Sequence, residues 1–344
     1  MTNENCDILD SSKDDAKVKI KFMPDYKLGE KWGGCRVSVS VQGETYAETL
    51  YMQKKTKSPI RKISKTEYKN IITGQIGQYK ERDGKYDESL KQTFARLRGL
   101  IRTNFTSGRK DQIFITLTYK DRRISTERLG IDFKNFTTRL RRHYPQKQFE
   151  YIAVIEPQAD GTWHVHLLLK VTNEDSLYIK QDVLQKLWGQ GIVFVEELKS
   201  VDDTGAYYVA YFTDVLDESK EGTKQKQKAE RLKYYPKNFK FYRCSRGIKE
   251  PEKIESFGSV VDDLYGRPKF EQTFAAVDQD GGDAVNIINK RVYKRKMKLD
   301  KPIIEALKEK TEEKKNANVK SVHKTEKEKM ELLNRKKSES DKNV

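Results

Sequence analysis

The sequence is poor in cysteine and lacks long apolar runs, and both absences narrow what the protein can be. Its three cysteines, Cys6, Cys35 and Cys244, are scattered and show no Cys-x-x-Cys spacing. This pattern predicts neither a disulfide framework nor a zinc knuckle, and it favours a reducing compartment, most simply the cytoplasm. No stretch approaches the roughly 20 apolar residues that span a bilayer, so we expect no membrane partner.

Two catalytic signatures are also missing. The chain has no Gly-x-x-x-x-Gly-Lys-Ser/Thr loop, which argues against ATP-driven unwinding by this protein, and no Ser-His-Asp arrangement presents itself. Histidine is scarce too, with four residues: His143, His164, His166 and His323. Two of the four are one residue apart inside an apolar run that is typical of a buried strand.

In that strand, alternate side chains share a face, so His164 and His166 point the same way. Burying two imidazoles side by side is costly unless each has a partner. A pair of half-buried, hydrogen-bonded histidines is the simpler interpretation. A divalent metal is the alternative, and the rest of the chain has to decide between them.

Positive charge is what the sequence has in excess. Sixty-nine Lys and Arg against 52 Asp and Glu give a net charge of +17, with an isoelectric point near 9.4. Such a charge is typical of proteins that bind polyanions, although it also serves solubility. Eighteen tyrosines and 14 phenylalanines offer faces on which unpaired bases could stack.

Hydrophobic periodicity predicts an α+β protein with an antiparallel sheet and flanking helices. Strands are expected at residues 17–22, 36–41, 113–119, 149–156, 163–169 and 192–195, and helices at 87–104, 125–144, 177–190 and from 202 onward. Trp32 to Gly34 is expected to be the turn between the first two strands, and residues 54–90 a linker or an irregular basic lobe. Thr116 and Thr118 are interpreted as structural strand residues, and Trp163 and Trp188 as core residues.

Three regions follow from these patterns. Residues 1–85 form a basic region that contains strands, residues 86–260 form the main domain, and residues 261–344 form a lysine-rich tail. From Lys290 to Val344 there are 19 Lys or Arg and 10 Asp or Glu, about half of the total excess. Such a run predicts a flexible tail that is partly helical or disordered.

The expected strand pair at 149–156 and 163–169 is joined by a short turn and should form a hairpin, which brings Glu156 beside His164 and His166. Downstream, Tyr207, Tyr208 and Tyr211 fall in the expected helix, where residues four apart share a face. A tyrosine hydroxyl can attack a phosphodiester, and because a phenol leaves more readily than an alkanol the covalent bond stays reversible. A metal held by histidines could polarise the phosphate.

With these motifs the sequence resembles the rolling-circle replication initiators of the HUH endonuclease superfamily, in the branch of plasmid and filamentous-phage replication proteins. Residues 113–119, 163–168 and 205–211 resemble the three family motifs in the family's order. The resemblance implies a palm-like, RRM-type antiparallel sheet, Mg²⁺ or Mn²⁺ held by His164, His166 and Glu156, and a 5′-phosphotyrosine. Many members place a lysine three residues after the nucleophile; here that position is Ala210, so the nucleophile stays open, in the order Tyr207, Tyr211, Tyr208.

We therefore expect an initiator that nicks and rejoins single-stranded origin DNA and depends on a host helicase and polymerase. A conjugative or mobilisation relaxase would use the same chemistry. An RRM-like nucleic-acid-binding protein without catalytic activity is the alternative from another class.

Overall fold

The computed structural model describes most of the chain, and it divides into two compact units. The described residues are 19–22, 28–53, 60–64, 66–70, 74–78, 87–121, 125–158, 160–198, 234–236, 239–277, 284–295 and 299–340. One unit consists of Lys80–Pro251. The other joins Met1–Tyr79 to Glu252–Val344. Each unit is described by itself.

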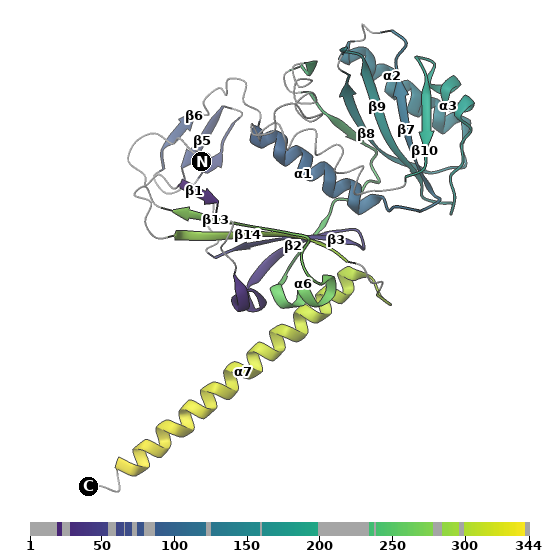
Figure 1. Ribbon diagram of the computed structural model, residues 1–344. Helices are drawn as coiled ribbons and strands as arrows, with labels where there is room; N and C mark the ends of the chain where they lie inside the picture. The colour runs from purple at the N-terminus through teal and green to yellow at the C-terminus, as the bar shows by residue number, and fades with distance from the viewer. Residues whose placement is uncertain are drawn as a thin grey trace, which may run out of the picture. The chain divides into compact units, whose positions relative to one another are not determined.

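The unit Lys80–Pro251 is built on a five-stranded sheet in the order β10-β7-β9-β8-β11 (Figure 1). The strands are β7 (Gln112–Thr118), β8 (Phe149–Pro157), β9 (Trp163–Val171), β10 (Val193–Glu196) and β11 (Tyr242–Cys244). All neighbouring strands are antiparallel, and β8 and β9 form the expected hairpin. The predicted α+β class and antiparallel sheet are confirmed, and the strand with the two histidines is central.

Two helices cover one face of this sheet, α2 (Thr126–His143) and α3 (Gln181–Trp188). Ser125 caps α2 by accepting a hydrogen bond from the amide of Arg128. The side chains that α2 buries recur every three or four residues, as one face of a helix requires. They are Leu129, Phe133, Phe136 and Leu140, which pack with Leu184 and Trp188 of α3 against the odd-numbered residues of β9.

The opposite face is covered by α1 (Asp87–Asn104), which contacts the even-numbered side of β9 (Figure 1). Its apolar stripe, Phe94, Leu97, Leu100 and Ile101, packs with Phe105 against Ile152, Val154 and Leu168. His164 and His166 are on the same side of β9 as Leu168, because alternate residues share a face. Thus α1 covers the part of this face near Leu168, and the histidines lie farther along the strand.

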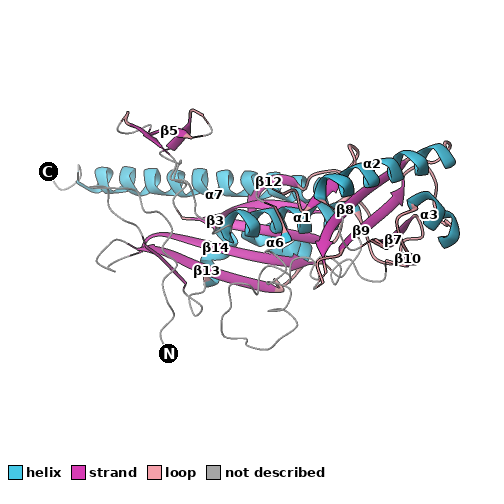
Figure 2. Ribbon diagram, turned by 90° about the horizontal axis from the view of Figure 1, so that it is seen from above, coloured by secondary structure: helices cyan, strands magenta, loops and turns pink. Residues whose placement is uncertain are grey.

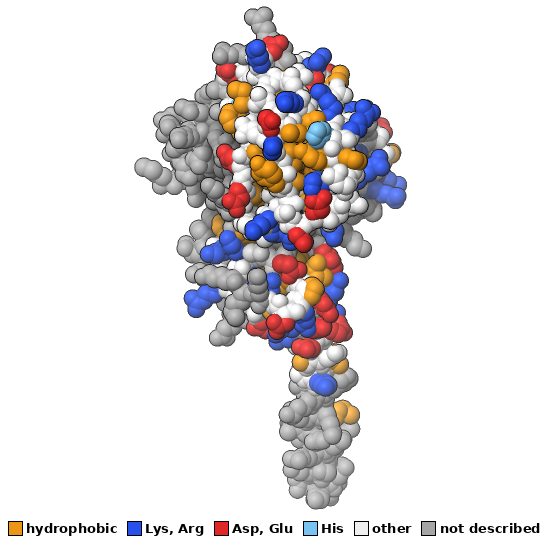
Figure 3. Space-filling model, turned by 90° about the vertical axis from the view of Figure 1, so that its right-hand side faces the viewer, with side chains coloured by type: hydrophobic (Ala, Val, Ile, Leu, Met, Phe, Trp, Pro, Cys, Tyr) orange, Lys and Arg blue, Asp and Glu red, His pale blue; other side chains and the backbone are white. Residues whose placement is uncertain are grey.

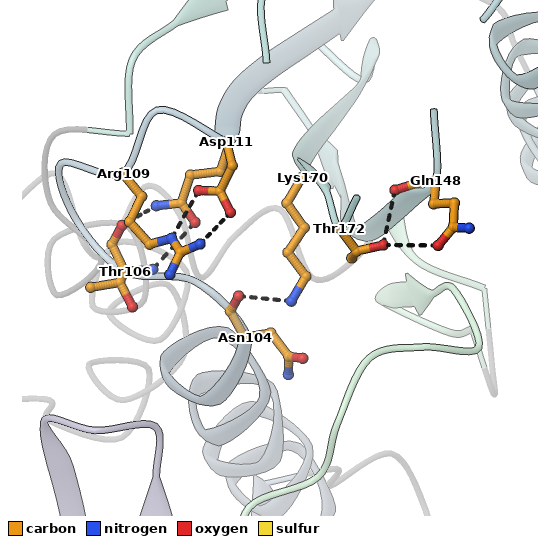
Figure 4. A network of polar contacts seen from close by, with 8 residues as sticks. Asn104, Thr106, Arg109, Asp111, Gln148, Lys170 and Thr172 are labelled. Atoms are coloured by element: carbon orange, nitrogen blue, oxygen red, sulfur yellow. Dashed lines mark hydrogen bonds and ion pairs between the residues drawn. The ribbon is translucent and has the colours of Figure 1, made fainter. Parts of the chain in front are cut away.

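A polar network fixes the C-terminus of α1 to the sheet (Figure 4). The Lys170 ammonium donates to the carbonyl of Asn104, 3.0 Å away, and lies 5.4 Å from the ring centre of Phe105. The Asn104 amide accepts from the backbone of Lys249 and donates back to it. Burial lowers the pKa of Lys170, but a cation at the end of a helix is favoured by the helix dipole.

The second unit contains a six-stranded sheet in the order β1-β13-β14-β3-β2-β12 (Figure 2). Its strands are β1 (Lys19–Phe22), β2 (Arg36–Gln42), β3 (Tyr46–Met52), β12 (Glu252–Phe257), β13 (Phe270–Val277) and β14 (Ala284–Lys294). One face packs against η1 (Gly29–Gly34), α6 (Gly258–Tyr265) and the first turns of α7 (Ile303–Ser340). This core contains Trp32, Val39, Val261, Tyr293 and Leu307.

Several sequence expectations differ from this architecture. Residues 261–277, 284–295 and 299–340 contribute a helix, two strands and a 38-residue helix, where a flexible tail was expected. The strands at 17–22 and 36–41 do not pair with each other, since β1 pairs with β13 and β2 pairs with β3 and β12. Trp32–Gly34 belongs to a 3₁₀ helix. The region boundary expected at 260 falls instead at 251/252.

Within the region expected to be a linker, the described residues form a small sheet of three strands, β4 (Ile60–Lys62), β5 (Glu67–Asn70) and β6 (Ile76–Gln78). Among the helices of the described ranges, none is both long and apolar enough to span a bilayer.

Candidate metal and phosphodiester site

Glu156 and the two histidines meet on the β8–β9 hairpin. The register places Glu156 directly opposite His164, and His166 two residues farther along β9. His166 Nε2 lies 2.8 Å from Glu156 Oε2, within hydrogen-bond distance, and both side chains are buried. The hairpin turn allows this because Gly161 takes a left-handed conformation, φ 82°, and Asp160 accepts from the amide of Thr162.

His166 is held from two further directions. Thr116 of β7 is its partner in the β-ladder, and the Thr116 hydroxyl lies 3.2 Å from His166 Nδ1. The ring of Phe114 stacks parallel to the imidazole, with centres 5.9 Å apart and an interplanar angle of 6°. Carboxylate, hydroxyl and aromatic ring together fix the orientation of the imidazole.

His164 is half-buried and lies nearer the end of the hairpin. Its ring centre is 6.2 Å from that of His166. Its ladder partner on β7 is Thr118, whose hydroxyl donates to the carbonyl of Ile192 instead of contacting a histidine. The two threonines share a face of one strand, so they have different partners in otherwise similar positions.

The donor chemistry of these side chains fits a divalent metal. Imidazole nitrogens with a carboxylate oxygen suit Mn²⁺, and the carboxylate also suits Mg²⁺. Two ligands of one ion, each at about 2.1 Å and at right angles, stand about 3 Å apart, and the His166 and Glu156 atoms are 2.8 Å apart. In the described ranges, however, no three His, Cys, Asp or Glu side chains already surround a common point. An ion would have to replace the direct bond between His166 and Glu156.

The three candidate nucleophiles, Tyr207, Tyr208 and Tyr211, lie outside the described residues. No distance from their hydroxyls to the histidines is therefore stated, and their roles stay predictions.

The edge of the sheet beside Thr116 carries exposed apolar side chains. Phe194 of β10 is the ladder partner of Thr116, and Phe194 and the nearby Ile192 are both about half exposed. At the far side of the sheet, the Arg141 guanidinium lies 5.8 Å from the ring centre of Tyr151. Figure 3, which views the molecule from the side where Figure 1 places α2 and α3, shows hydrophobic side chains interspersed with Lys and Arg. Such a surface is compatible with a nucleic-acid strand.

Sequence patterns identified the histidines and Glu156 but did not identify the role of Thr116, which was interpreted as a structural residue. Threonine is common in strands, and the contact with His166 follows only from the β7–β9 register. Phe114 was overlooked for the same reason. A signal existed in the even spacing of Phe114, Thr116 and Thr118, which places all three on one face of the strand.

Comparison with known proteins supports this location of the site. Residues 112–216 match a family model that describes the replication-associated protein ORF2. The matched range begins at β7 and contains both histidines, Glu156 and the three candidate tyrosines. The match supports a replication initiator family and implies DNA binding, and it covers less than half of the chain. No curated protein and no solved structure matches the chain.

Proposed function

We propose that the chain is a rolling-circle replication initiator of the HUH endonuclease type, which nicks and rejoins single-stranded origin DNA. The observation that carries this proposal is the buried contact between His166 and Glu156, inside the range that matches replication-associated proteins. Such a contact places metal-binding groups where a noncatalytic RRM-like protein has no use for them. The protein would act in the cytoplasm with a host helicase and polymerase.

His164, His166 and Glu156 would hold Mg²⁺ or Mn²⁺, and the bound ion would neutralise charge on the oxygens of the scissile phosphate. The hydroxyl oxygen of one tyrosine attacks phosphorus, a tyrosyl O–P bond forms, and the bond from phosphorus to the 3′ oxygen breaks. The phenolic proton goes to solvent or a nearby base, and the leaving oxygen becomes a 3′-OH. Attack by that 3′-OH on the phosphotyrosine reverses the reaction and rejoins the strand.

A covalent adduct is the direct test. Labelled single-stranded DNA from each strand of the chain's own replicon, incubated with the protein and Mn²⁺, is expected to give a protein–DNA adduct that survives denaturation. Tyr207→Phe should abolish the adduct, whereas Tyr208→Phe should retain it. Loss in Tyr211→Phe alone would move the nucleophile to Tyr211. If the wild-type protein forms no adduct on either strand, the proposal fails.

Thr116 provides a prediction about ion affinity. The hydroxyl can donate to Nδ1 when Nε2 carries the proton, and it can accept from Nδ1 when Nε2 binds a metal. Because a ligating histidine is oriented by the partner of its other nitrogen, losing that partner typically costs 10–100-fold in metal affinity. Thr116→Val, which keeps the β-branched shape, is expected to weaken Mn²⁺ binding by about that factor in calorimetric titration.

Thr118→Val is the matched control, because it removes a hydroxyl from the same strand face that bonds the Ile192 carbonyl. It should leave Mn²⁺ affinity within about twofold of wild type, while Thr116→Ser should restore most of the loss. Equal affinities in Thr116→Val and Thr118→Val would show that Thr116 does not position His166.

A further inference from the structure

The second unit contains a cavity that the proposed cleavage chemistry does not use. It lies at the end of the six-stranded sheet where β14 finishes and β13 begins, and its volume is about 460 Å³. Residues 263–269 form one wall, and Lys294 and Arg295 form the other. The wall can turn so tightly because Gly266, which ends α6, has a φ of 79°.

Positive charge dominates the lining. Four cations, Arg267, Lys269, Lys294 and Arg295, face one carboxylate, Asp263. Arg295 also bonds the carbonyl of Glu44, at 2.7 Å from Nη2, and approaches its carboxylate at 3.4 Å. Even when Glu44 is counted with Asp263, the cavity keeps an excess of positive charge. An anion is therefore the ligand that its charge favours.

Two buried donors in the lining have no acceptor. Arg295 Nη1 and the Tyr265 hydroxyl find no hydrogen-bond partner among the described residues. The Arg295 side chain is 8% exposed and Tyr265 is 4% exposed. Burial raises the pKa of Tyr265, so its hydroxyl stays protonated and can donate. Leaving such a donor unpaired costs about 1–3 kcal/mol, and native structures rarely tolerate it without a reason.

Apolar surface accompanies these charges. Leu264 and Pro268 contribute to the lining, and Phe270, the first residue of β13, is about half exposed one position beyond Lys269. A free inorganic phosphate needs no such surface, whereas a nucleotide brings a sugar and a base that can stack on an aromatic ring. The combination suits a nucleic-acid strand better than a small anion.

We propose that this cavity binds a phosphodiester of single-stranded DNA, with Tyr265, Arg267, Lys269 and Arg295 as phosphate donors and Phe270 as a stacking surface. The unit formed by residues 1–79 and 252–344 then carries a DNA contact of its own, in addition to the histidine site of the other unit. This contact needs neither a metal nor a catalytic tyrosine.

Tyr265→Phe tests the orphan hydroxyl in the full chain. Without DNA, the variant should melt at the same temperature as wild type or higher, because an unpaired buried hydroxyl has been removed. With a saturating unlabelled oligonucleotide in EDTA, wild type should gain more in melting temperature than the variant. An equal gain in both proteins would overturn the role of Tyr265.

Arg267→Ala/Lys269→Ala tests the charges, with Lys310→Ala/Lys320→Ala as control. The control pair lies on exposed positions of α7 and removes the same number of cations. By fluorescence anisotropy in EDTA at 100 mM salt, the cavity variant should bind a labelled single strand about tenfold more weakly than the control, a difference of about 1.4 kcal/mol. Its salt dependence should also be shallower by about 1.4, from two phosphate contacts at about 0.7 each.

Inorganic phosphate provides the remaining arm. If phosphate alone raises the melting temperature of wild type as much as the oligonucleotide does, and both double variants bind DNA equally, the cavity is a free-phosphate site and the DNA assignment is overturned. Because EDTA prevents cleavage, these results do not depend on whether the proposed nicking activity is correct.

Discussion

Replacing His166 by alanine is expected to lower the rate of DNA cleavage by about a hundredfold to ten-thousandfold. Polarisation of a phosphoryl oxygen by a bound ion contributes several kcal/mol to the transition state, and each 1.36 kcal/mol is a factor of ten in rate. His166 should matter more than His164, because it is buried and contacts Glu156, Thr116 and Phe114. Single-turnover cleavage of a labelled single strand in Mn²⁺ measures this effect.

The same substitution should also affect stability. Glu156 is 3% exposed, and without His166 its Oε2 loses a partner at 2.8 Å. Leaving a buried acceptor with fewer partners costs about 1–3 kcal/mol. His166→Ala is therefore expected to unfold at a lower urea concentration than wild type, and its cleavage should be measured well below that concentration.

His143→Ala is the matched control, since His143 is exposed at the end of α2 and its ring contacts Tyr144. It should cleave DNA and unfold like wild type. DNA binding in EDTA should stay within a few fold of wild type in both variants, because phosphate contacts by Lys and Arg dominate affinity. Cleavage by His166→Ala at the rate of His143→Ala would contradict the assignment of the site.

The histidine site was predictable from the sequence because its signals are local. Alternation places His164 and His166 on one face, and the turn at Asp160 and Gly161 makes a hairpin that brings Glu156 alongside. What the sequence could not provide is the neighbouring strand. Thr116 is 50 residues before His166, and their contact depends on the register of β7 with β9.

The second unit was not predictable for two physical reasons. Its sheet joins β3 to β14, and those strands are separated by most of the chain, so neither segment shows its partner. In addition, β14 buries polar residues where a strand pattern is expected to show apolar ones. Asn289 and Arg291 face the core and bond Glu271 of β13, at 2.9 and 2.8 Å. Satisfied polar groups of this kind make a core strand resemble a solvated lysine-rich segment.

Replacing Trp188 by alanine should give the largest loss of stability in the unit Lys80–Pro251. The side chain is fully buried, and its ring contacts Tyr119 and Phe136 edge-on, at 5.1 and 5.9 Å between centres. The prediction that Trp188 is a core residue is thus confirmed. Removing a large buried aromatic ring costs about 3–5 kcal/mol, because lost burial and the remaining cavity both destabilise. Urea unfolding followed by fluorescence measures the change.

Trp188→Phe separates packing from hydrogen bonding. Trp188 Nε1 donates to the Thr118 carbonyl at 2.6 Å, and phenylalanine fills part of the space without that donor. We expect the phenylalanine variant to lose about 1–3 kcal/mol, mostly from the unpaired carbonyl. Trp163 still reports on this unit in both variants, and Trp32 reports on the other.

Thr118 is the ladder partner of His164, so the indole also holds the end of β7 beside the proposed metal site. Trp188→Phe should therefore weaken Mn²⁺ binding less than Thr116→Val does, since it leaves the contact between Thr116 and His166 in place. If Trp188→Phe instead reduced Mn²⁺ affinity as much as Thr116→Val while unfolding like wild type, the position of β7 rather than the Thr116 hydroxyl would determine ion binding.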